Sequence, residues 1–470
     1  MTRDFLDDRI RKDLNRRSGA LFLAVLTVLS AAVFFGAALL QRYAGIDDFT
    51  GTKQEEFIRL TSIVYTAVFL LTFLLQWGPL KKLPALYAIG FAGISGLIIL
   101  AKISLLDYVS DDYEIFLSNW IYEYSSMGLK QGLGTYIGSD YSPPYLYFLW
   151  FISRVKNFPW FYLVKSISVA FDALLGFAIM KLVSLQDERP AVQLGAFVLA
   201  MMLPTVVFNG AYWSQCDVIY SSLSLLALYN AVKRRDIASM LLFGVALSFK
   251  LQTVFFLPAL LPLWLRKDIR LRTLPLIPAG YMGMMIPALW GGKSLHHVLT
   301  VYLQQAGAYG FITVNGPTLY ELFIPGKDEK GTFYLMFGNM ALFLAFGFMV
   351  AVCILLCMNK ERATKDVVLL SALVFLAGVP FFLPKIHERY TFGADVLALA
   401  VAFRKPRRRV LLPVCFGFAS YVCYTAGLAG EKILPQNIAS LFQLAGIALA
   451  LYELWRVLQP DAMRVEERKA

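Results

Sequence analysis

Three carboxylates stand close together at Asp111, Asp112 and Glu114, directly after an apolar segment. Carboxylates this close repel one another, and a carboxylate crowded by like charge is well suited to act as a general base toward a reacting hydroxyl. Tyr113 lies among them and is expected to support their orientation. A helix cap is the alternative, because acidic residues before a helix accept hydrogen bonds from its first N–H groups. The sequence leaves both interpretations open and does not decide between Asp111 and Asp112 as the base.

A basic turn lies between two later apolar segments and carries Lys385, His387 and Arg389, with Glu388 among them. Lys and Arg side chains bind phosphate oxygens well, and the planar guanidinium can do so with two parallel hydrogen bonds. A single cation at a membrane boundary is explained by snorkelling to the aqueous phase. Three such groups within five positions favour a phosphate or pyrophosphate site, in which Glu388 would orient its neighbours.

A third polar cluster consists of Gln215, Asp217 and Lys250, at the ends of neighbouring apolar segments. Gln215 and Asp217 are expected to support the site. Lys250 either forms an ion pair with Asp217 or adds a cation to the phosphate site. Deeper in the apolar segments, Lys165 and Asp172 are seven residues apart, and we expect an ion pair between them, because an unsatisfied charge in a membrane is costly.

The sequence predicts no cofactor. His296 and His297 have no carboxylate or further His at ligand spacing, so they are interpreted as a polar pair in a loop. The five Cys lie mostly in apolar segments and are interpreted as small apolar residues. The adjacent Asp111 and Asp112 leave a divalent metal open.

The composition places these clusters in an integral membrane protein. Of the 470 residues, 58% are hydrophobic and 16% are charged, and the mean hydropathy is +0.60. Soluble domains carry about 25% charged residues. These values exclude a disordered, a collagen-like or a nucleic-acid-binding chain and predict an all-α transmembrane protein.

A membrane-spanning helix needs about 20 apolar residues, and the sequence has about fourteen such segments, with a range of about 11 to 14. Two of them, 253–266 and 390–403, are short, so each could be re-entrant or merged with a neighbour. The expected spans are 19–40, 59–78, 84–105, 159–183, 190–208, 217–233, 237–252, 253–266, 272–290, 333–358, 367–383, 390–403, 409–427 and 436–457.

The charge distribution predicts the orientation of these spans. The net charge is +12, and basic residues flank membrane spans preferentially on the cytoplasmic side. With a cytoplasmic amphipathic segment at 1–18, a membrane domain at 19–457 and a cytoplasmic tail at 458–470, most Lys and Arg lie inside. The basic runs at 233–235 and 404–409 are therefore interpreted as topology anchors in preference to a lipid-headgroup or partner site.

The same topology leaves two long loops outside, at 106–159 and 291–332. The first carries the acidic cluster and two stretches, 114–124 and 143–153, that are expected to be helices at the membrane surface, where Trp and Tyr are favoured. All three polar clusters then fall on the outer face, which makes the first loop the expected catalytic loop.

Several short motifs, in their order along residues 84–400, resemble those of the GT-C superfamily of polytopic membrane glycosyltransferases. Within it they are most similar to the dolichyl-phosphate-glucose-dependent glucosyltransferases of N-glycan assembly and to bacterial proteins related to the second mannosyltransferase of GPI-anchor synthesis. The motifs are Asp112-Tyr113-Glu114, Pro143-Pro144, Gly210 to Asp217, Phe249 to Gln252, and His387-Glu388-Arg389. The chain departs from the eukaryotic pattern in having Asp111 before Asp112, where a smaller residue is expected, and Arg389 where Lys is common.

The resemblance implies a GT-C fold and an inverting transfer of a hexose from a polyprenyl-phosphate donor to a glycan or lipid acceptor outside the cytoplasm. The donor phosphate would be held by Lys385, His387 and Arg389, with Lys250 as a further candidate. A bacterial plasma membrane is expected, with undecaprenyl phosphate as the carrier and the cell envelope as the destination. The alternative is a multi-span transporter or flippase of lipid-linked sugars, whose sites usually lie near the middle of the membrane in broken helices.

Overall fold

The computed structural model divides the chain into two units, Met1–Leu105 and Leu106–Ala470, and the second unit carries the candidate site. Most of the first unit lies outside the described residues. The segment 1–18, which was expected to be cytoplasmic, and the expected spans 19–40 and 59–78 lie there. The same holds for most of span 84–105 and of the tail 458–470. The described residues are 93–96, 98, 102, 105–307, 310–324, 331–429 and 434–459.

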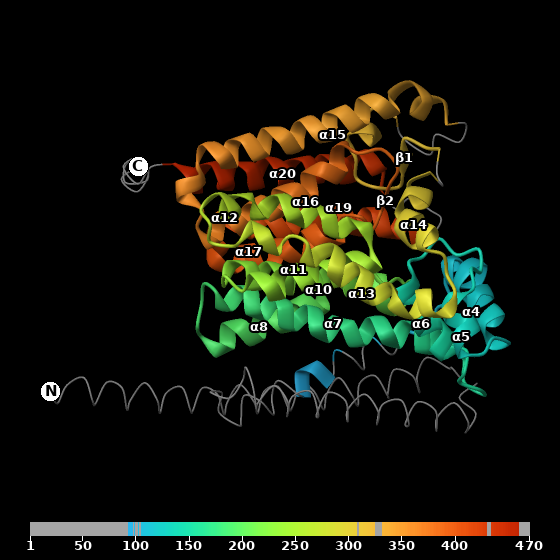
Figure 1. Ribbon diagram of the computed structural model, residues 1–470. Helices are drawn as coiled ribbons and strands as arrows, with labels where there is room; N and C mark the ends of the chain where they lie inside the picture. Colours follow the sequence, from blue (N-terminus) through green and yellow to red (C-terminus); the bar gives the residue numbers. More distant parts are fainter. Residues whose placement is uncertain are drawn as a thin grey trace. The chain divides into compact units, whose positions relative to one another are not determined.

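The second unit is built almost wholly of helices (Figure 1). Five of them, in the described part of the chain, are long and apolar enough to cross a membrane. The protein is therefore an all-α membrane protein. The five helices are α7 (Trp160–Ser184), α15 (Thr332–Met358), α16 (Lys365–Phe382), α19 (Leu411–Ala429) and α20 (Gln436–Leu458).

Each span expected from residue 159 onward coincides with helix, but several are shorter than a full crossing. These shorter helices are α10 (Asp217–Val232), α11 (Asp236–Phe249), α13 (Leu276–Gly291) and α17 (Phe392–Arg404). The expected span 253–266 is a 3-10 helix, η3 (Leu251–Leu260), followed by the short α12 (Leu261–Leu265). Proline inside η3, at Pro258, lacks the N–H that a continuous α-helix needs.

The expected span 190–208 is broken at Leu203. It consists of α8 (Pro190–Met202), α9 (Pro204–Val206) and the π-helix η2 (Val207–Tyr212). The part before Leu203 and the part after it meet at a bend of 51°. Pro204 explains the break, because its ring cannot follow a preceding helical turn. The bend matters for the polar clusters, because η2 carries Asn209, whose side chain donates a hydrogen bond to Asp217.

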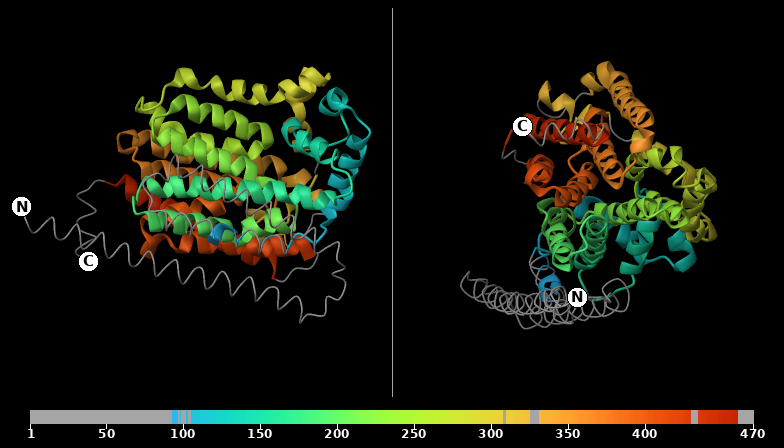
Figure 2. Two further views of the ribbon diagram at one scale, coloured as in Figure 1. Left: turned by 90° about the horizontal axis from the view of Figure 1, so that it is seen from below. Right: turned by 90° about the vertical axis from the view of Figure 1, so that its left-hand side faces the viewer.

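The helices of this unit run side by side, so their ends gather at two opposite ends of the bundle (Figures 1 and 2). α10 begins at Asp217 and α17 begins at Phe392, and these first residues share one end with the last residue of α16. At the other end, the basic run 233–235 follows the last residue of α10, and the run 404–409 begins at the last residue of α17. The polar clusters and the basic runs are thus separated by the length of a helix.

Among the residues of the second basic run whose burial the structure describes, Arg409 is interior. Arg409, the last residue of α18 (Pro406–Arg409), is fully buried and donates to both carboxylate oxygens of Asp366, at 2.9 and 3.1 Å. Its Nε lies 2.7 Å from Glu453 in α20. The interpretation of 404–409 as a run of anchors is therefore wrong for Arg409, which ties α16 to α20 through a buried ion cluster.

The loop between residues 106 and 159 contains the π-helix η1 (Tyr113–Leu117), α4 (Ser118–Ser125), α5 (Leu129–Gly134) and α6 (Pro143–Ile152). The stretches 114–124 and 143–153 are thus helical, and α5 is an addition that the sequence did not predict. These helices lie at the end of the bundle that carries the polar clusters (Figure 1).

The second loop contributes α14 (Leu295–Gly307), η5 (Leu319–Leu322) and the strand β1 (Thr313–Val314). β1 pairs in parallel with β2 (Ile386–His387), with Val314 opposite His387. Strands of two residues leave no periodic pattern in a sequence, so this pair was not predicted. It fixes the second loop against the turn that carries His387.

Gly244→Ala is expected to lower the free energy of unfolding by about 1–3 kcal/mol, because overpacking forces backbone shifts. A Cβ on Gly244 in α11 would lie 2.2 Å from the carbonyl oxygen of Ile277 in α13. The matched control is Gly283→Ala in α13, where a Cβ meets nothing within 4 Å. Thermal unfolding of both purified variants in detergent measures the difference, and equal midpoints would contradict the close approach of α11 and α13.

Candidate active site

Asp217, the first residue of α10, is fully buried and lies at the centre of the polar cluster. Its Oδ1 is 2.5 Å from the Nζ of Lys250, which follows α11. Its Oδ2 accepts a hydrogen bond of 2.8 Å from the Nδ2 of Asn209, and that amide also donates to the hydroxyl of Tyr424 at 2.9 Å. The expected Asp217–Lys250 ion pair is therefore present and joins the ends of two helices.

Arg389 joins this centre to the acidic cluster of the first loop. Its Nε lies 3.8 Å from Asp217 Oδ2, and its Nη1 lies 3.8 Å from Asp112 Oδ2. The same Nη1 donates to Glu388 Oε1 at 3.1 Å. Gln215 completes the link, because its Nε2 donates to Asp112 Oδ2 at 2.6 Å. One guanidinium thus lies among three carboxylates from three distant parts of the sequence.

The geometry separates Asp112 from its acidic neighbours. Asp111 and Glu114 are exposed, and neither has a hydrogen bond or ion pair to the cluster among the described residues. Tyr113 is buried and packs edge-on against Phe161, with ring centroids 6.0 Å apart. Of the acidic cluster, only Asp112 faces Arg389 and Gln215.

The helix-cap alternative is wrong for Asp112. Asp112 is the residue before η1, but its side chain accepts no capping hydrogen bond from that helix. The Oγ of Ser110 accepts from the N–H of Tyr113 instead, at 3.4 Å. The carboxylate of Asp112 is left for contacts within the polar cluster.

Arg389 also lines a small polar cavity of about 60 Å³. Asp140 and Tyr141 from the first loop and Gln305 from α14 contribute to its lining. Its lining residues are Asp140, Tyr141, Phe249, Lys250, Gln252, Gln305, His387, Arg389 and Tyr390. The cavity holds a few water molecules or one small polar group.

A larger and more apolar groove of about 320 Å³ adjoins this cavity, and the two share Gln252, Gln305 and Tyr390. The groove is lined by Leu251, Gln252, Phe255, Tyr302, Gln305, Tyr334, Leu342, Leu383, Pro384, Lys385, Ile386 and Tyr390. A polar cavity next to an apolar groove suits a ligand with a polar head and a hydrocarbon tail.

The basic turn is therefore split between the two spaces. His387 and Arg389 line the polar cavity, whereas Lys385 lines the groove, with its Nζ 4.4 Å from the centre of the Tyr334 ring. Glu388 is buried and lines neither space. Burial raises the pKa of Glu388, and the positive charge of Arg389 opposes that rise. The expected convergence of Lys385, His387 and Arg389 thus holds for two of the three side chains.

Three of the residues that sequence reasoning missed come from the two long loops: Asp140, Tyr141 and Gln305. The hydroxyl of Tyr141 donates to Gln215 Oε1 at 3.0 Å, so it fixes the amide that contacts Asp112. The Nε2 of Gln305 donates to the carbonyl oxygen of Asp140. The pKa of Asp140 is raised, because the cavity walls partly desolvate this solvent-accessible carboxylate. Their only sequence signal was their position in the two long loops.

The expected ion pair between Lys165 and Asp172 is wrong. The Nζ of Lys165 donates to the backbone carbonyl oxygens of Leu106 and Tyr108. Residues seven apart on a helix are about 10 Å apart along its axis, which is too far for an ion pair without strong bending of the side chains. Lys165 instead fastens the start of the first loop, at Leu106 and Tyr108, to α7.

In the described part of the chain, no three His, Cys, Asp or Glu residues are grouped so that they could hold a metal ion. The site brings together two accessible carboxylates, those of Asp112 and Asp140, with the guanidinium of Arg389 and the imidazole of His387. These groups are suited to acid–base and electrostatic chemistry.

Lys250→Met is expected to lower the free energy of unfolding by about 3 kcal/mol, since removing one partner of a buried ion pair leaves the other charge uncompensated. The Asp217 side chain is 0% exposed and that of Lys250 is 12% exposed. Lys267→Met, at an exposed loop position, is the control. Denaturation of both variants in detergent gives the comparison. Equal stabilities would show that Lys250 does not compensate Asp217.

No protein-family model matches the chain, and no curated protein matches it. The fold and the site by themselves define the class: an all-helical membrane protein with a buried polar cluster where the helices meet two structured loops. Arg389 and Lys250 of that cluster line the polar cavity, and the Asp112 side chain is 31% exposed.

Proposed function

We propose that this protein is an inverting glycosyltransferase of the GT-C type that moves a hexose from a polyprenyl-phosphate donor to a glycan or lipid acceptor. The observation that carries the proposal is the position of Arg389. Its guanidinium is 3.8 Å from the carboxylate of Asp112 and lines a polar cavity that adjoins an apolar groove. A base, a cation and a place for a lipid tail are thus close together.

The donor phosphate binds in the polar cavity, against Arg389 and His387, and the polyprenyl chain follows the apolar groove past Phe255 and Leu342. Lys385 lies in the groove and adds positive charge near the phosphate. Lys250 is engaged by Asp217, so its main part is to hold the cluster in place. Positive groups fixed in a poorly solvated site stabilise a leaving phosphate without protonating it.

Asp112 takes the proton of the acceptor hydroxyl as its oxygen attacks the anomeric carbon. General-base catalysis of this kind contributes about 10²- to 10⁴-fold to the rate. Gln215 and Tyr141 orient the carboxylate through the hydrogen bonds described above. A single displacement of this kind inverts the configuration at the anomeric carbon.

The site faces the outside in this proposal, and both termini are cytoplasmic. The basic runs 233–235 and 404–409 lie at the end of the bundle opposite to Asp112, and basic ends of membrane helices face the cytoplasm. A count of about fourteen spans, a bacterial plasma membrane and an undecaprenyl-phosphate carrier belong to the same proposal.

The test is incubation of the purified protein with a panel of polyprenyl-phosphate sugars and candidate acceptors, with release of the free lipid phosphate read by mass. Release from one donor in the presence of an acceptor is the expected result. A donor that crosses the membrane of a proteoliposome with its sugar still attached would contradict the proposal and favour a transporter or flippase.

A further inference from the structure

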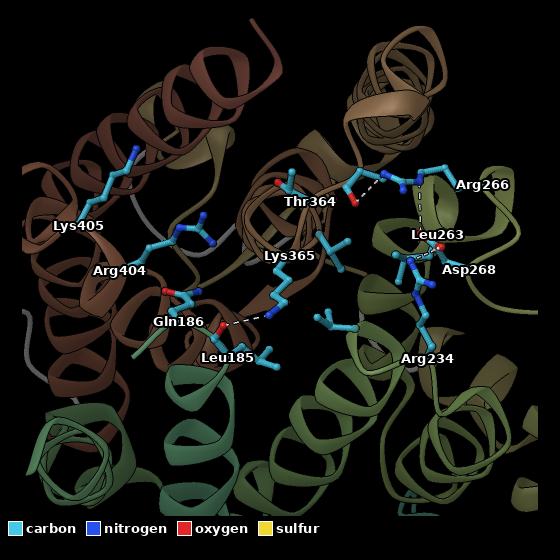
Figure 3. A pocket seen from close by; sticks show the side chains of 13 residues that line it. Leu185, Gln186, Arg234, Leu263, Arg266, Asp268, Thr364, Lys365, Arg404 and Lys405 are labelled. Atoms are coloured by element: carbon cyan, nitrogen blue, oxygen red, sulfur yellow. Dashed lines mark hydrogen bonds and ion pairs between the residues drawn. The ribbon is translucent and has the colours of Figure 1, made fainter. Parts of the chain in front are cut away.

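A second cavity, of about 740 Å³, lies at the end of the bundle opposite to the candidate active site. Its lining comes from the ends of α7, α10 and α17, from α12 and the residues after it, and from the start of α16 (Figure 3). The lining residues are Leu185, Gln186, Val232, Arg234, Leu263, Arg266, Asp268, Ala363, Thr364, Lys365, Val368, Arg404 and Lys405. The volume is within the range of about 300–1,000 Å³ typical of small-molecule sites.

Five cationic side chains line this cavity, and they come from four segments that are far apart in the sequence. Arg404 and Lys405 lie on one side, Arg234 and Arg266 lie on the other, and Lys365 lies between them (Figure 3).

Arg404 is ion-paired at 2.9 Å with Asp366, which lies outside the lining. Among the lining residues, Asp268 carries the one carboxylate. It is shared by Arg234 at 2.8 Å and Arg266 at 3.3 Å. Lys365 and Lys405 have no ion pair among the described residues, and the lining is strongly positive.

The start of α16 adds to this positive potential. Thr364 is the N-cap of α16, and its hydroxyl accepts from the N–H of Val367 at 3.3 Å. The cavity therefore includes the positive end of an 18-residue helix, whose first N–H groups have no partner within the helix and attract anions.

Membrane topology alone does not account for this arrangement. The positive-inside rule requires basic residues near the helix ends, and exposed residues such as Lys233, Lys267 and Lys360 meet it without lining a cavity. The five lining cations instead converge on one concave space. Converging Arg and Lys side chains at a helix N-terminus are the typical recognition chemistry of phosphate.

We propose that this basic cavity binds an anion carrying a multiply charged phosphate group, at a site separate from the candidate active site. The phosphate contacts Lys365 and Lys405 and the start of α16, and Arg404 and Arg266 flank it. The anion is either a soluble phosphate compound or the phosphomonoester headgroup of a lipid, which present the same chemistry to these side chains.

The test uses the full-length protein in phosphatidylcholine nanodiscs, with inorganic pyrophosphate as the soluble probe and calorimetric titration as the measurement. A second arm uses nanodiscs that contain a minor fraction of phosphatidic acid and counts the lipid retained by native mass spectrometry. The double variant K365Q/K405Q removes two lining charges that have no ion pair. The double variant K233Q/K360Q removes two exposed charges near the same end of the bundle and is the matched control.

The expected result is saturable binding in either arm. K365Q/K405Q is expected to weaken it at least about tenfold, because charge-assisted hydrogen bonds contribute at least this much to affinity. K233Q/K360Q is expected to leave it unchanged. Binding of pyrophosphate alone identifies a soluble ligand, and retention of phosphatidic acid alone identifies a headgroup. Absence of saturable binding in both arms would overturn the proposal, and so would equal weakening in the two double variants.

Discussion

Asp112→Asn is expected to slow sugar transfer from the polyprenyl-phosphate donor by at least about 100-fold. Asn keeps the shape of the side chain, and its carbonyl oxygen can still accept from Gln215, whose Nε2 is 2.6 Å from Asp112 Oδ2 in the wild type. It cannot take a proton from the acceptor hydroxyl. The initial rate of lipid-phosphate release at saturating donor measures the effect, and the thermal midpoint in detergent reports that the variant is folded.

Asp111→Asn is the matched control, because it makes the same chemical change one residue away. Asp111 is exposed and forms no ion pair with Arg389 among the described residues, so its variant is expected to transfer sugar at close to the wild-type rate. If Asp111→Asn were inactive and Asp112→Asn active, the base would be Asp111. Full activity of both variants would refute general-base catalysis by this cluster.

Arg389→Lys is expected to raise the KM for the donor at least about tenfold, with a smaller change in the KM for the acceptor. Lysine keeps the charge, but a single ammonium cannot replace a planar guanidinium that lies among Asp112, Asp217 and Glu388. The donor phosphate would lose its second hydrogen-bond donor. Steady-state kinetics with each substrate varied in turn separates the two constants.

The control for this substitution is Arg189→Lys, at a pair with Asp187 in which the Arg189 side chain is 77% exposed. Exposed ion pairs contribute little to stability. This pair is also remote from the polar cavity that Arg389 lines, so both KM values are expected to stay unchanged. A larger change for the acceptor than for the donor in Arg389→Lys would contradict a phosphate-binding role for Arg389.

The helices could be predicted from the sequence, because runs of apolar residues of sufficient length report burial in lipid or protein wherever they occur. The ends of α7, α10 and α16 fall within two residues of the expected ends. Prolines account for the deviations: Pro204 breaks one expected span, and Pro258 lies within the 3-10 segment of another. The number of crossings was less predictable, because α10, α11 and α17 are apolar but short.

The polar clusters could also be predicted, but their mutual contacts could not. Asp112 and Gln215 are 103 residues apart, and Arg389 lies far beyond both, so only the three-dimensional packing of η1, η2 and α17 brings them together. The β1–β2 pair and the contact of Tyr141 with Gln215 left no pattern in the sequence. Arg409 was misassigned because a buried Arg and an exposed Arg look the same in a basic run.

The most direct test of the proposed reaction uses the polyprenyl-phosphate sugar that the purified protein turns over, labelled with ¹³C at the anomeric carbon. NMR follows this carbon during turnover. The labelled carbon is expected to leave the phosphate and to appear in a glycoside of the opposite anomeric configuration, and Asp112→Asn is expected to prevent this change. A label that stays bound to phosphate, or a product with retained configuration, would contradict direct displacement assisted by Asp112.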